Sequence, residues 1–218
     1  MATKERLSLV ANIAVIGLVA FALLRPSGPI GLRISLWYDN YTARRIVARE
    51  WTSIAATRRV DLTQRPVAIV EFSDYECPFC RKQHVVLTKV LADPRAGGLA
   101  FRHLPLAIHE HADGAARTAI CAEKQGRFVA MHNRLFTTDK WMTDTNWTRE
   151  ALEAGITDTS GFRKCRTSEE TSALLREDMR IAERLNIRGT PAFVASDKVH
   201  VGGLPDTTYF QFGTRLTR

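Results

Sequence analysis

The sequence predicts an α/β domain that follows an apolar segment able to cross a membrane. Three observations lead to this prediction. Residues 7–24 read LSLVANIAVIGLVAFALL and carry no charge. A β-branched run at residues 67–72 is followed by a helical pattern and then by a second short apolar run. A Cys-x-x-Cys pair, Cys77 and Cys80, stands where the first run gives way to the helix.

Length and composition allow one well-buried domain with appendages. The chain has 218 residues, 45% of them hydrophobic, which is enough for a domain of roughly 150 residues. Its charged fraction of 25% is ordinary, so collagenous, repetitive and wholly disordered classes are excluded. The net charge of +8 comes from scattered basic residues without a nucleic-acid motif. This charge favours an anionic membrane surface as partner and no nucleic acid.

The apolar run at residues 7–24 predicts a transmembrane signal anchor. Its 18 residues are near the short end for a spanning helix and exceed a usual signal-peptide core. No small-x-small cleavage site follows it, which favours an uncleaved anchor over a removed signal peptide. Residues 1–6 contain Lys4 and Arg6 and are expected to be a cytoplasmic tail. The rest of the chain is then expected on the other side of the membrane.

Residues 25–62 are expected to form a stalk. Apolar residues recur there at loosely helical spacing among many arginines, which predicts a partly helical segment. We expect a linker that holds the domain at 63–218 away from the bilayer. The alternative is an amphipathic surface that lies on the membrane or associates with a second copy.

The domain begins with a strand, a helix and a second strand. The β-branched run at 67–72 predicts a buried strand, and 78–92 predicts a helix with Pro78 in its first turn. A second strand is expected at 99–104. This spacing predicts a right-handed crossover and a parallel strand pair.

The second half of the domain is expected to be a helical insertion followed by a hairpin. Helical patterns run from about 112 to 184 with breaks, within an insertion at about 110–186. Strands at 192–195 and 199–201 flank a turn, and a final helix starts near Pro205.

A Cys-x-x-Cys pair at the start of a helix favours thiol–disulfide exchange. Unpaired N–H groups and the positive end of the helix dipole stabilise a thiolate at Cys77, which we expect to be the exposed, attacking sulfur. Cys80 lies about one turn later and can resolve a mixed disulfide. No metal or cofactor is needed for this reaction.

Two other interpretations of the pair are weaker. Half of a zinc site would need further ligands, but Cys121 and Cys165 lie alone and far apart, without a His-x-x-x-His partner. A purely structural disulfide does not explain the position of the pair directly after a core strand.

The segments VEFSDYECPFC, RGTPAFV and VGG resemble the DsbA-type thiol oxidoreductases of the thioredoxin superfamily, especially the membrane-anchored bacterial type. The resemblance runs from about Pro66 to the C-terminus and does not include the anchor or the stalk. It implies a thioredoxin fold with an inserted helical domain.

The resemblance also implies roles for single residues. The Thr190–Pro191 bond is expected to be cis and to face the active pair, where Thr190, Pro191, Pro78 and Phe79 would bind substrate. Glu71 matches a buried acid that moves a proton to or from the second thiol, although a paired surface glutamate is the alternative. The strongest oxidases of the family carry His where this chain has Phe79, which leaves the redox potential open.

The resemblance further implies a structural disulfide between Cys121 and Cys165. Closing a loop of about 44 residues would stabilise the domain by about 3 to 4 kcal/mol in the chain-entropy model. Two separate buried thiols are the alternative. We expect neither a metal site nor a catalytic base at the four histidines of this region, His103, His109, His111 and His132.

The expected function is therefore that of a protein thiol–disulfide oxidoreductase. Its substrates would be exported proteins with cysteines, most simply oxidised by the Cys77–Cys80 disulfide, and a quinone-linked membrane partner would restore that disulfide. We expect a single-pass protein of the bacterial inner membrane with its catalytic domain on the periplasmic side. The alternatives are a reductase or isomerase of the same fold, and a non-catalytic binding protein or chaperone.

Overall fold

The computed structural model describes residues 13, 15–25, 27–60 and 65–213. The expected tail at 1–6, the first part of the expected anchor and the expected start of the domain at 63 lie outside the described residues. The chain divides into two compact units, residues 1–42 and 43–218.

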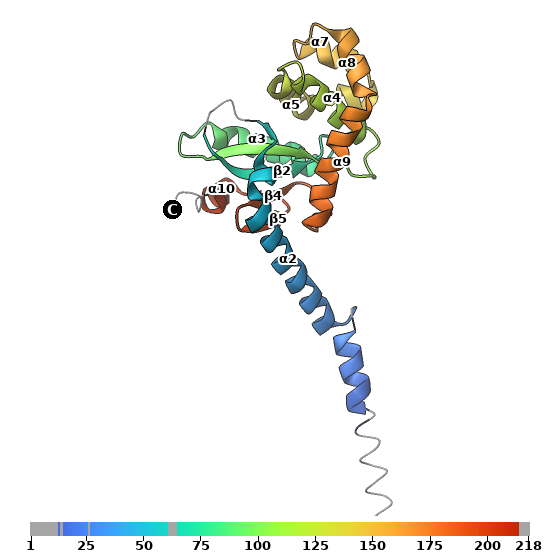
Figure 1. The fold of residues 1–218 in the computed structure, drawn as a ribbon, viewed down its shortest axis with the longest axis vertical. Helices are drawn as coiled ribbons and strands as arrows, with labels where there is room; N and C mark the ends of the chain where they lie inside the picture. Colours follow the sequence, from blue (N-terminus) through green and yellow to red (C-terminus); the bar gives the residue numbers. More distant parts are fainter. Residues whose placement is uncertain (1–12, 14, 26, 61–64, 214–218) are drawn as a thin grey trace, which may run out of the picture. The chain divides into compact units, whose positions relative to one another are not determined.

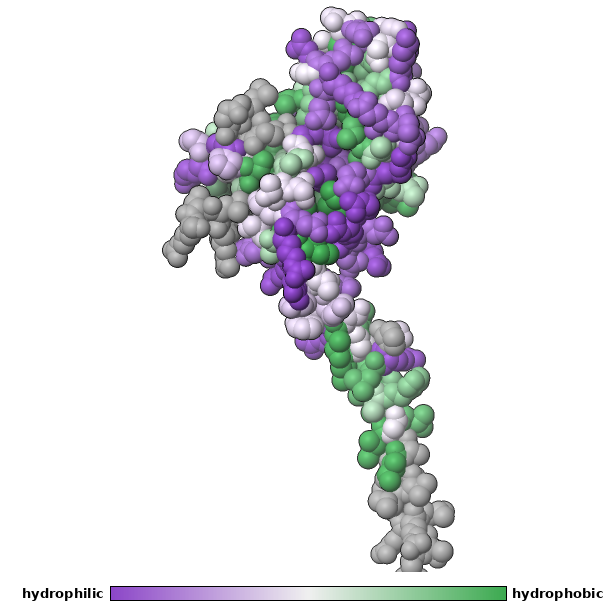
Figure 2. Space-filling model, viewed as in Figure 1, coloured by the Kyte–Doolittle hydropathy of each residue, from purple (hydrophilic) through white to green (hydrophobic). Residues whose placement is uncertain are grey.

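The described part of the first unit is helical and apolar. One helical stretch among the described residues, Val15–Ala55, is long and apolar enough to cross a membrane by length and composition. Its exposed side chains in the first unit are mostly large and apolar, and Figure 2 shows them in green. They include Ile16, Leu18, Phe21 and Leu32.

Helix α2 spans Pro29–Ala55 and continues into the second unit. Ala43, Val47 and Ile54 are buried, and the last two pack in the same apolar cluster as the central strands. The prediction of a stalk over 25–62 was therefore wrong from Ala43 onward. The apolar positions of this helix contact strands that come later in the chain, which the local pattern does not reveal.

The described part of the second unit contains a five-stranded sheet of order β1-β3-β2-β4-β5. Strands β2 and β3 are parallel, as predicted, and the other neighbouring pairs are antiparallel. The strands are β1 (Arg58–Arg59), β2 (Val67–Ser73), β3 (Gly98–His103), β4 (Ala192–Ala195) and β5 (Lys198–Val201). The short edge strand β1 was not predicted, because two arginines carry no strand pattern.

Helices cover both faces of the sheet (Figure 1). On one face Ile69 of β2 shares a cluster with residues of α3 (Pro78–Leu91) and α10 (Asp206–Gly213). On the other face Val70 and Phe72 pack with α2 and α9 (Glu169–Arg184). Alternation along β2 thus buries both faces, at about 1.5 to 3 kcal/mol for each large apolar side chain.

A helical lobe is inserted between β3 and β4, as predicted (Figure 1). Its core is apolar and includes Met131, Leu135, Trp141 and Phe162. The lobe consists of α4 (Ala112–Glu123), α5 (Phe128–Thr137), α6 (Lys140–Thr143), α7 (Trp147–Glu153) and α8 (Thr159–Arg166). Helix α9 follows and returns the chain to the sheet.

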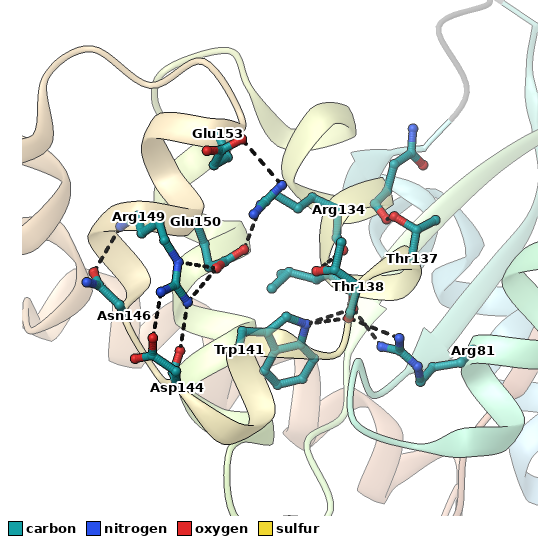
Figure 3. Close-up of polar contacts among 12 residues, drawn as sticks. Arg81, Arg134, Thr137, Thr138, Trp141, Asp144, Asn146, Arg149, Glu150 and Glu153 are labelled. Carbon is teal, nitrogen blue, oxygen red and sulfur yellow. Dashed lines mark hydrogen bonds and ion pairs between the residues drawn. The ribbon is translucent and has the colours of Figure 1, made fainter.

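Polar contacts attach this lobe to α3, as Figure 3 shows. Arg81 of α3 donates hydrogen bonds to the carbonyl oxygens of Leu135 and Thr138 at 2.8 and 3.0 Å. The indole N–H of Trp141 also donates to the Thr138 carbonyl, at 2.9 Å. The helix that carries the cysteine pair is therefore tied to the lobe one residue after Cys80.

A buried ion cluster joins the edge of the sheet to α9. The carboxylate of Asp178 contacts the guanidinium groups of Arg58 and Arg102, each at 2.7 Å, and accepts the backbone N–H of His103 at 3.0 Å. Arg102 also donates to the carbonyl oxygen of Ile54 in α2, at 2.9 Å. One carboxylate thus connects β1, β3 and α9, and through Arg102 also α2.

Replacing Asp178 with Asn is expected to lower the free energy of unfolding by about 3 to 5 kcal/mol, because it leaves two buried guanidinium groups without their shared anion. Urea unfolding of the full chain in detergent micelles measures this. The matched control is Glu177→Gln, one residue earlier, where the side chain is 47% exposed and the change should cost less than about 1 kcal/mol. Equal stability of the two variants would contradict the role given to Asp178.

Candidate active site

The turn between β2 and α3 places Cys77 at the N-terminus of the helix. The Asp74 carboxylate accepts the backbone N–H of Glu76 at 2.8 Å, and the Asp74 carbonyl accepts that of Cys77 at 3.2 Å. Cys77 is the N-cap residue, and no side-chain hydrogen bond caps the helix. Pro78 follows in the first turn, where its fixed φ suits a helix start. The first turn of α3 therefore directs free N–H groups toward the Cys77 sulfur.

The thiol of Cys77 is acidic in this position. Cys77 and Cys80 are both free thiols in the structure. A hydrogen bond from Cys80 lowers the pKa of Cys77 to about 5, and the backbone N–H groups of Phe79 and Cys80 add to this effect, which burial opposes. The Cys77 sulfur is therefore a thiolate at neutral pH.

Cys77 is only 3% exposed, although we expected an exposed sulfur. Its Sγ lies 3.5 Å from the carbonyl oxygen of Thr190, and the Thr190–Pro191 bond is cis, as the resemblance implied. Thr190 lies 113 residues after Cys77 in the chain. The sequence around Cys77 therefore does not reveal that this segment covers the sulfur.

Cys80 and Glu71 lie deeper in the same region. Cys80 is fully buried; burial raises its pKa, and the Cys77 thiol and the charge of Glu71 raise it further. Glu71 on β2 is 2% exposed, and burial raises its pKa to about 8 against a smaller opposing effect of Ser73. It is therefore a buried acid rather than a paired surface residue. The two cysteines thus differ strongly in acidity, and a protonated carboxyl group is close enough to influence the second.

A hollow of about 480 Å³ lies beside the cysteine pair. Phe79, Thr190 and Pro191 line it together with residues of α3 and the glycines after β5. The Phe79 ring is 66% exposed, which suits a contact with a partner chain. Pro78, also predicted to bind substrate, is exposed but is not among the lining residues.

Cys121 and Cys165 form a disulfide that joins α4 to α8, as predicted. This bond lies in the helical lobe. A bond of this kind is typical of proteins that mature in an oxidising compartment.

Among the described residues, no group of three or more His, Cys, Asp or Glu side chains lies so that it could hold a metal ion. His132 contacts the hydroxyl of Tyr75 at 3.2 Å inside the core, and His103 is fully buried. Burial lowers the pKa of both rings well below the ordinary value, so they are neutral.

The structure also gives Asp74 and His109 a place at the site that the sequence did not indicate. The His109 Nδ1 lies 2.7 Å from the Asp74 carboxylate, across 35 residues of sequence. The one local signal is an acidic residue shortly before the cysteine pair, which is too common to identify a partner.

The fold and the site together define a DsbA-like member of the thioredoxin superfamily. They combine a strand that leads through a turn to an acidic cysteine at a helix start, a cis-proline that faces this cysteine, and a helical insertion. A family model described as thioredoxin matches residues 63–209. The chain therefore belongs to the thioredoxin family.

Curated relatives share this segment rather than their whole length. A protein named Na(+)/H(+) antiporter NhaA 3, from Salinispora tropica, is 29% identical over 140 residues, which are 64% of this chain and 21% of the antiporter. A "Probable disulfide bond formation protein D" of Bacillus anthracis is 29% identical over 140 residues, 58% of this chain and 64% of that protein. The chain thus spans about a fifth of the length of the antiporters that it matches.

Solved structures agree with the fold. A thioredoxin-like oxidoreductase from Silicibacter pomeroyi DSS-3 is 32% identical with a TM-score of 0.59, covering 66% of this chain and 82% of that one. The thiol-disulfide exchange protein α-DsbA2 from Wolbachia pipientis is 16% identical with a TM-score of 0.67, covering 83% and 98%.

Replacing Glu71 with Gln is expected to remove a pH dependence of stability. The pKa of Glu71 is higher in the folded protein, about 8, than its ordinary value of 4.5. The contribution of protonated Glu71 to the free energy of unfolding is therefore fully present below about pH 4.5, and it is lost as the pH rises to about 8. Between pH 5 and 8 the variant should gain stability relative to wild type by about 1.4 kcal/mol per pH unit.

Urea unfolding of the full chain in detergent at several pH values measures this difference. The control is Glu183→Gln on α9, whose side chain is exposed and which should follow the wild-type pH profile. If Glu71→Gln and wild type kept a constant difference over this range, Glu71 would not be a protonated buried acid.

Proposed function

We propose that this protein exchanges a Cys77–Cys80 disulfide with the cysteines of exported proteins, most simply as a disulfide donor. The observation that carries the proposal is the Cys77 sulfur at the N-terminus of α3, stabilised as a thiolate beside Cys80 and the Thr190–Pro191 segment. An acidic, nucleophilic thiol next to a second thiol of high pKa is the arrangement that disulfide exchange uses.

The reaction has two displacement steps. A substrate thiolate attacks the Cys77 sulfur of the oxidised pair, forming a mixed disulfide and releasing Cys80. Cys80 takes up a proton, and Glu71, protonated at neutral pH because its pKa is about 8, can supply it. A second substrate thiolate then attacks the substrate sulfur of the mixed disulfide and releases Cys77 as a thiolate. The substrate gains one disulfide, and the enzyme pair is reduced by two electrons.

The low pKa of Cys77 supports the oxidising direction. A stabilised thiolate is a good leaving group in the second step, and it stabilises the reduced form of the pair. Both effects favour transfer of the disulfide to the substrate. The reduced pair then needs a membrane oxidant, for which a quinone-linked partner is proposed.

Substrate would bind beside the cis-proline. Phe79, Thr190 and Pro191 line the neighbouring hollow, and the carbonyl of Thr190 lies directly at the Cys77 sulfur. An extended substrate chain could pair with this backbone while its cysteine reaches Cys77. Pro78 would contribute at the exposed rim.

The apolar N-terminal helix supports a membrane-anchored location. We place the domain on the periplasmic side of the bacterial inner membrane, where exported cysteines are oxidised. The disulfide between Cys121 and Cys165 fits such a compartment. The relatives named as antiporters also support a place for this domain at a membrane.

Oxidative refolding of a reduced, unfolded ribonuclease tests the proposal, with the full chain in detergent and its Cys77–Cys80 pair first oxidised by glutathione disulfide. Cys77→Ser is expected to abolish the activity, because it removes the sulfur that the substrate thiolate attacks. Cys80→Ser cannot form the Cys77–Cys80 disulfide and is expected to lose the activity as well. Given ribonuclease with mispaired disulfides, its Cys77 thiolate should attack a substrate disulfide and accumulate a mixed disulfide, visible on a non-reducing gel, because the resolving thiol is missing.

The control is the double variant Cys121→Ala with Cys165→Ala, which should keep the exchange activity while losing stability. Activity that survives loss of both Cys77 and Cys80 would instead support a chaperone or binding protein. Reduction of insulin without any oxidation of ribonuclease would support a reductase.

A further inference from the structure

The buried carboxylate of Asp74 binds the loop that follows β3. It thereby attaches this loop to the turn between β2 and α3, which carries Cys77. Its side chain is fully buried and accepts three hydrogen bonds. The donors are the backbone N–H groups of Glu76 and Leu106, both at 2.8 Å, and the His109 Nδ1 at 2.7 Å. The backbone carbonyl of the same residue accepts the N–H of Cys77. Asp74 therefore links the His109 ring directly to the turn that carries the reactive thiol.

A second bond fixes the same loop. The backbone N–H of His111 donates to the Glu76 carboxylate at 2.7 Å. The loop is thus attached at His109 and at His111 to the two acidic residues that precede Cys77. This double attachment sets the position of the His109 ring relative to the sulfur.

The ionisable groups that raise the pKa of His109, which are Asp74, Cys77 and Glu76, are all negative when ionised. Burial lowers the pKa of His109, but the hydrogen bond to Asp74 and the charges of Asp74, Cys77 and Glu76 outweigh it, and the pKa is raised overall. The interaction between two titrating groups is reciprocal. If the Cys77 thiolate favours the His109 imidazolium, the imidazolium favours the thiolate by the same free energy.

We propose that His109 is a positioning residue of the exchange site: held by Asp74, its imidazolium stabilises the Cys77 thiolate and neutralises the buried carboxylate beside it. A neutral side chain at this position would leave the Asp74 charge and the thiolate as neighbouring like charges. The inference rests on the proposed function only in taking Cys77 as the reactive thiol.

The test is the pH dependence of Cys77 alkylation by iodoacetamide in the full chain in detergent, followed at the Cys77 peptide by mass spectrometry. His109→Gln keeps a hydrogen-bond donor but no charge, and it is expected to raise the pKa of Cys77 by about one unit. A unit corresponds to about tenfold less thiolate at a pH below the pKa. His109→Lys keeps a positive charge and is expected to retain most of the wild-type acidity.

The matched control is His111→Gln, two residues along the same loop, which keeps the backbone donor to Glu76 and is expected to leave the pKa of Cys77 unchanged. An unchanged pKa in His109→Gln would overturn the proposal. Equal losses in His109→Gln and His109→Lys would also overturn it, because the effect would then come from hydrogen bonding and not from charge.

A measurement without substitutions keeps the proposal testable if a variant does not fold. In wild-type protein labelled with ¹³C at histidine, the His109 ring should titrate at higher pH when the Cys77–Cys80 pair is reduced than when it is oxidised. The same titration in both states would reject the proposal. These readouts measure acidity rather than turnover, so an inactive protein with the expected shift would reject the proposed function alone.

Discussion

The stabilised thiolate at the N-terminus of α3 is the interaction on which the rest of the site depends. Strand β2 ends just before this point. The turn between β2 and α3, closed by the hydrogen bond from the Cys77 N–H to the Asp74 carbonyl, places the first helical N–H groups near the Cys77 sulfur. The Thr190–Pro191 segment covers the sulfur from the opposite part of the domain. Arg81 ties the helix to the lobe, so that the sulfur keeps one position.

The same region gives its titrating groups opposite environments. Cys77 meets donors and becomes acidic, whereas Cys80 and Glu71 are buried and prefer their neutral forms. Because each unit of pKa corresponds to about 1.4 kcal/mol, these differences are large enough to set the order of bond breaking. In our account Cys77 is the leaving group and Cys80 receives a proton, with Glu71 as the nearby acid.

Local sequence predicted the elements that carry the chemistry. The run at β2, the helix start at Pro78 and the hairpin of β4 and β5 were found, because each depends on neighbouring residues. The motif around Pro191 indicated its cis bond through resemblance alone. The features that the sequence did not predict all depend on long-range contacts. They are the packing of α2 from Ala43 onward, strand β1, the burial of Cys77 and the Asp74–His109 pair. Each depends on residues distant in sequence whose meeting leaves no periodic pattern.

The equilibrium of the Cys77–Cys80 pair with glutathione, measured on the full chain in detergent, tests the central claim most directly. If the thiolate stabilises the reduced form as the structure indicates, the reduction potential should lie near the oxidising end of the known range, about −120 mV. A potential near −270 mV, about that of thioredoxin, would contradict the account, because the stabilised thiolate would then not make the pair a disulfide donor.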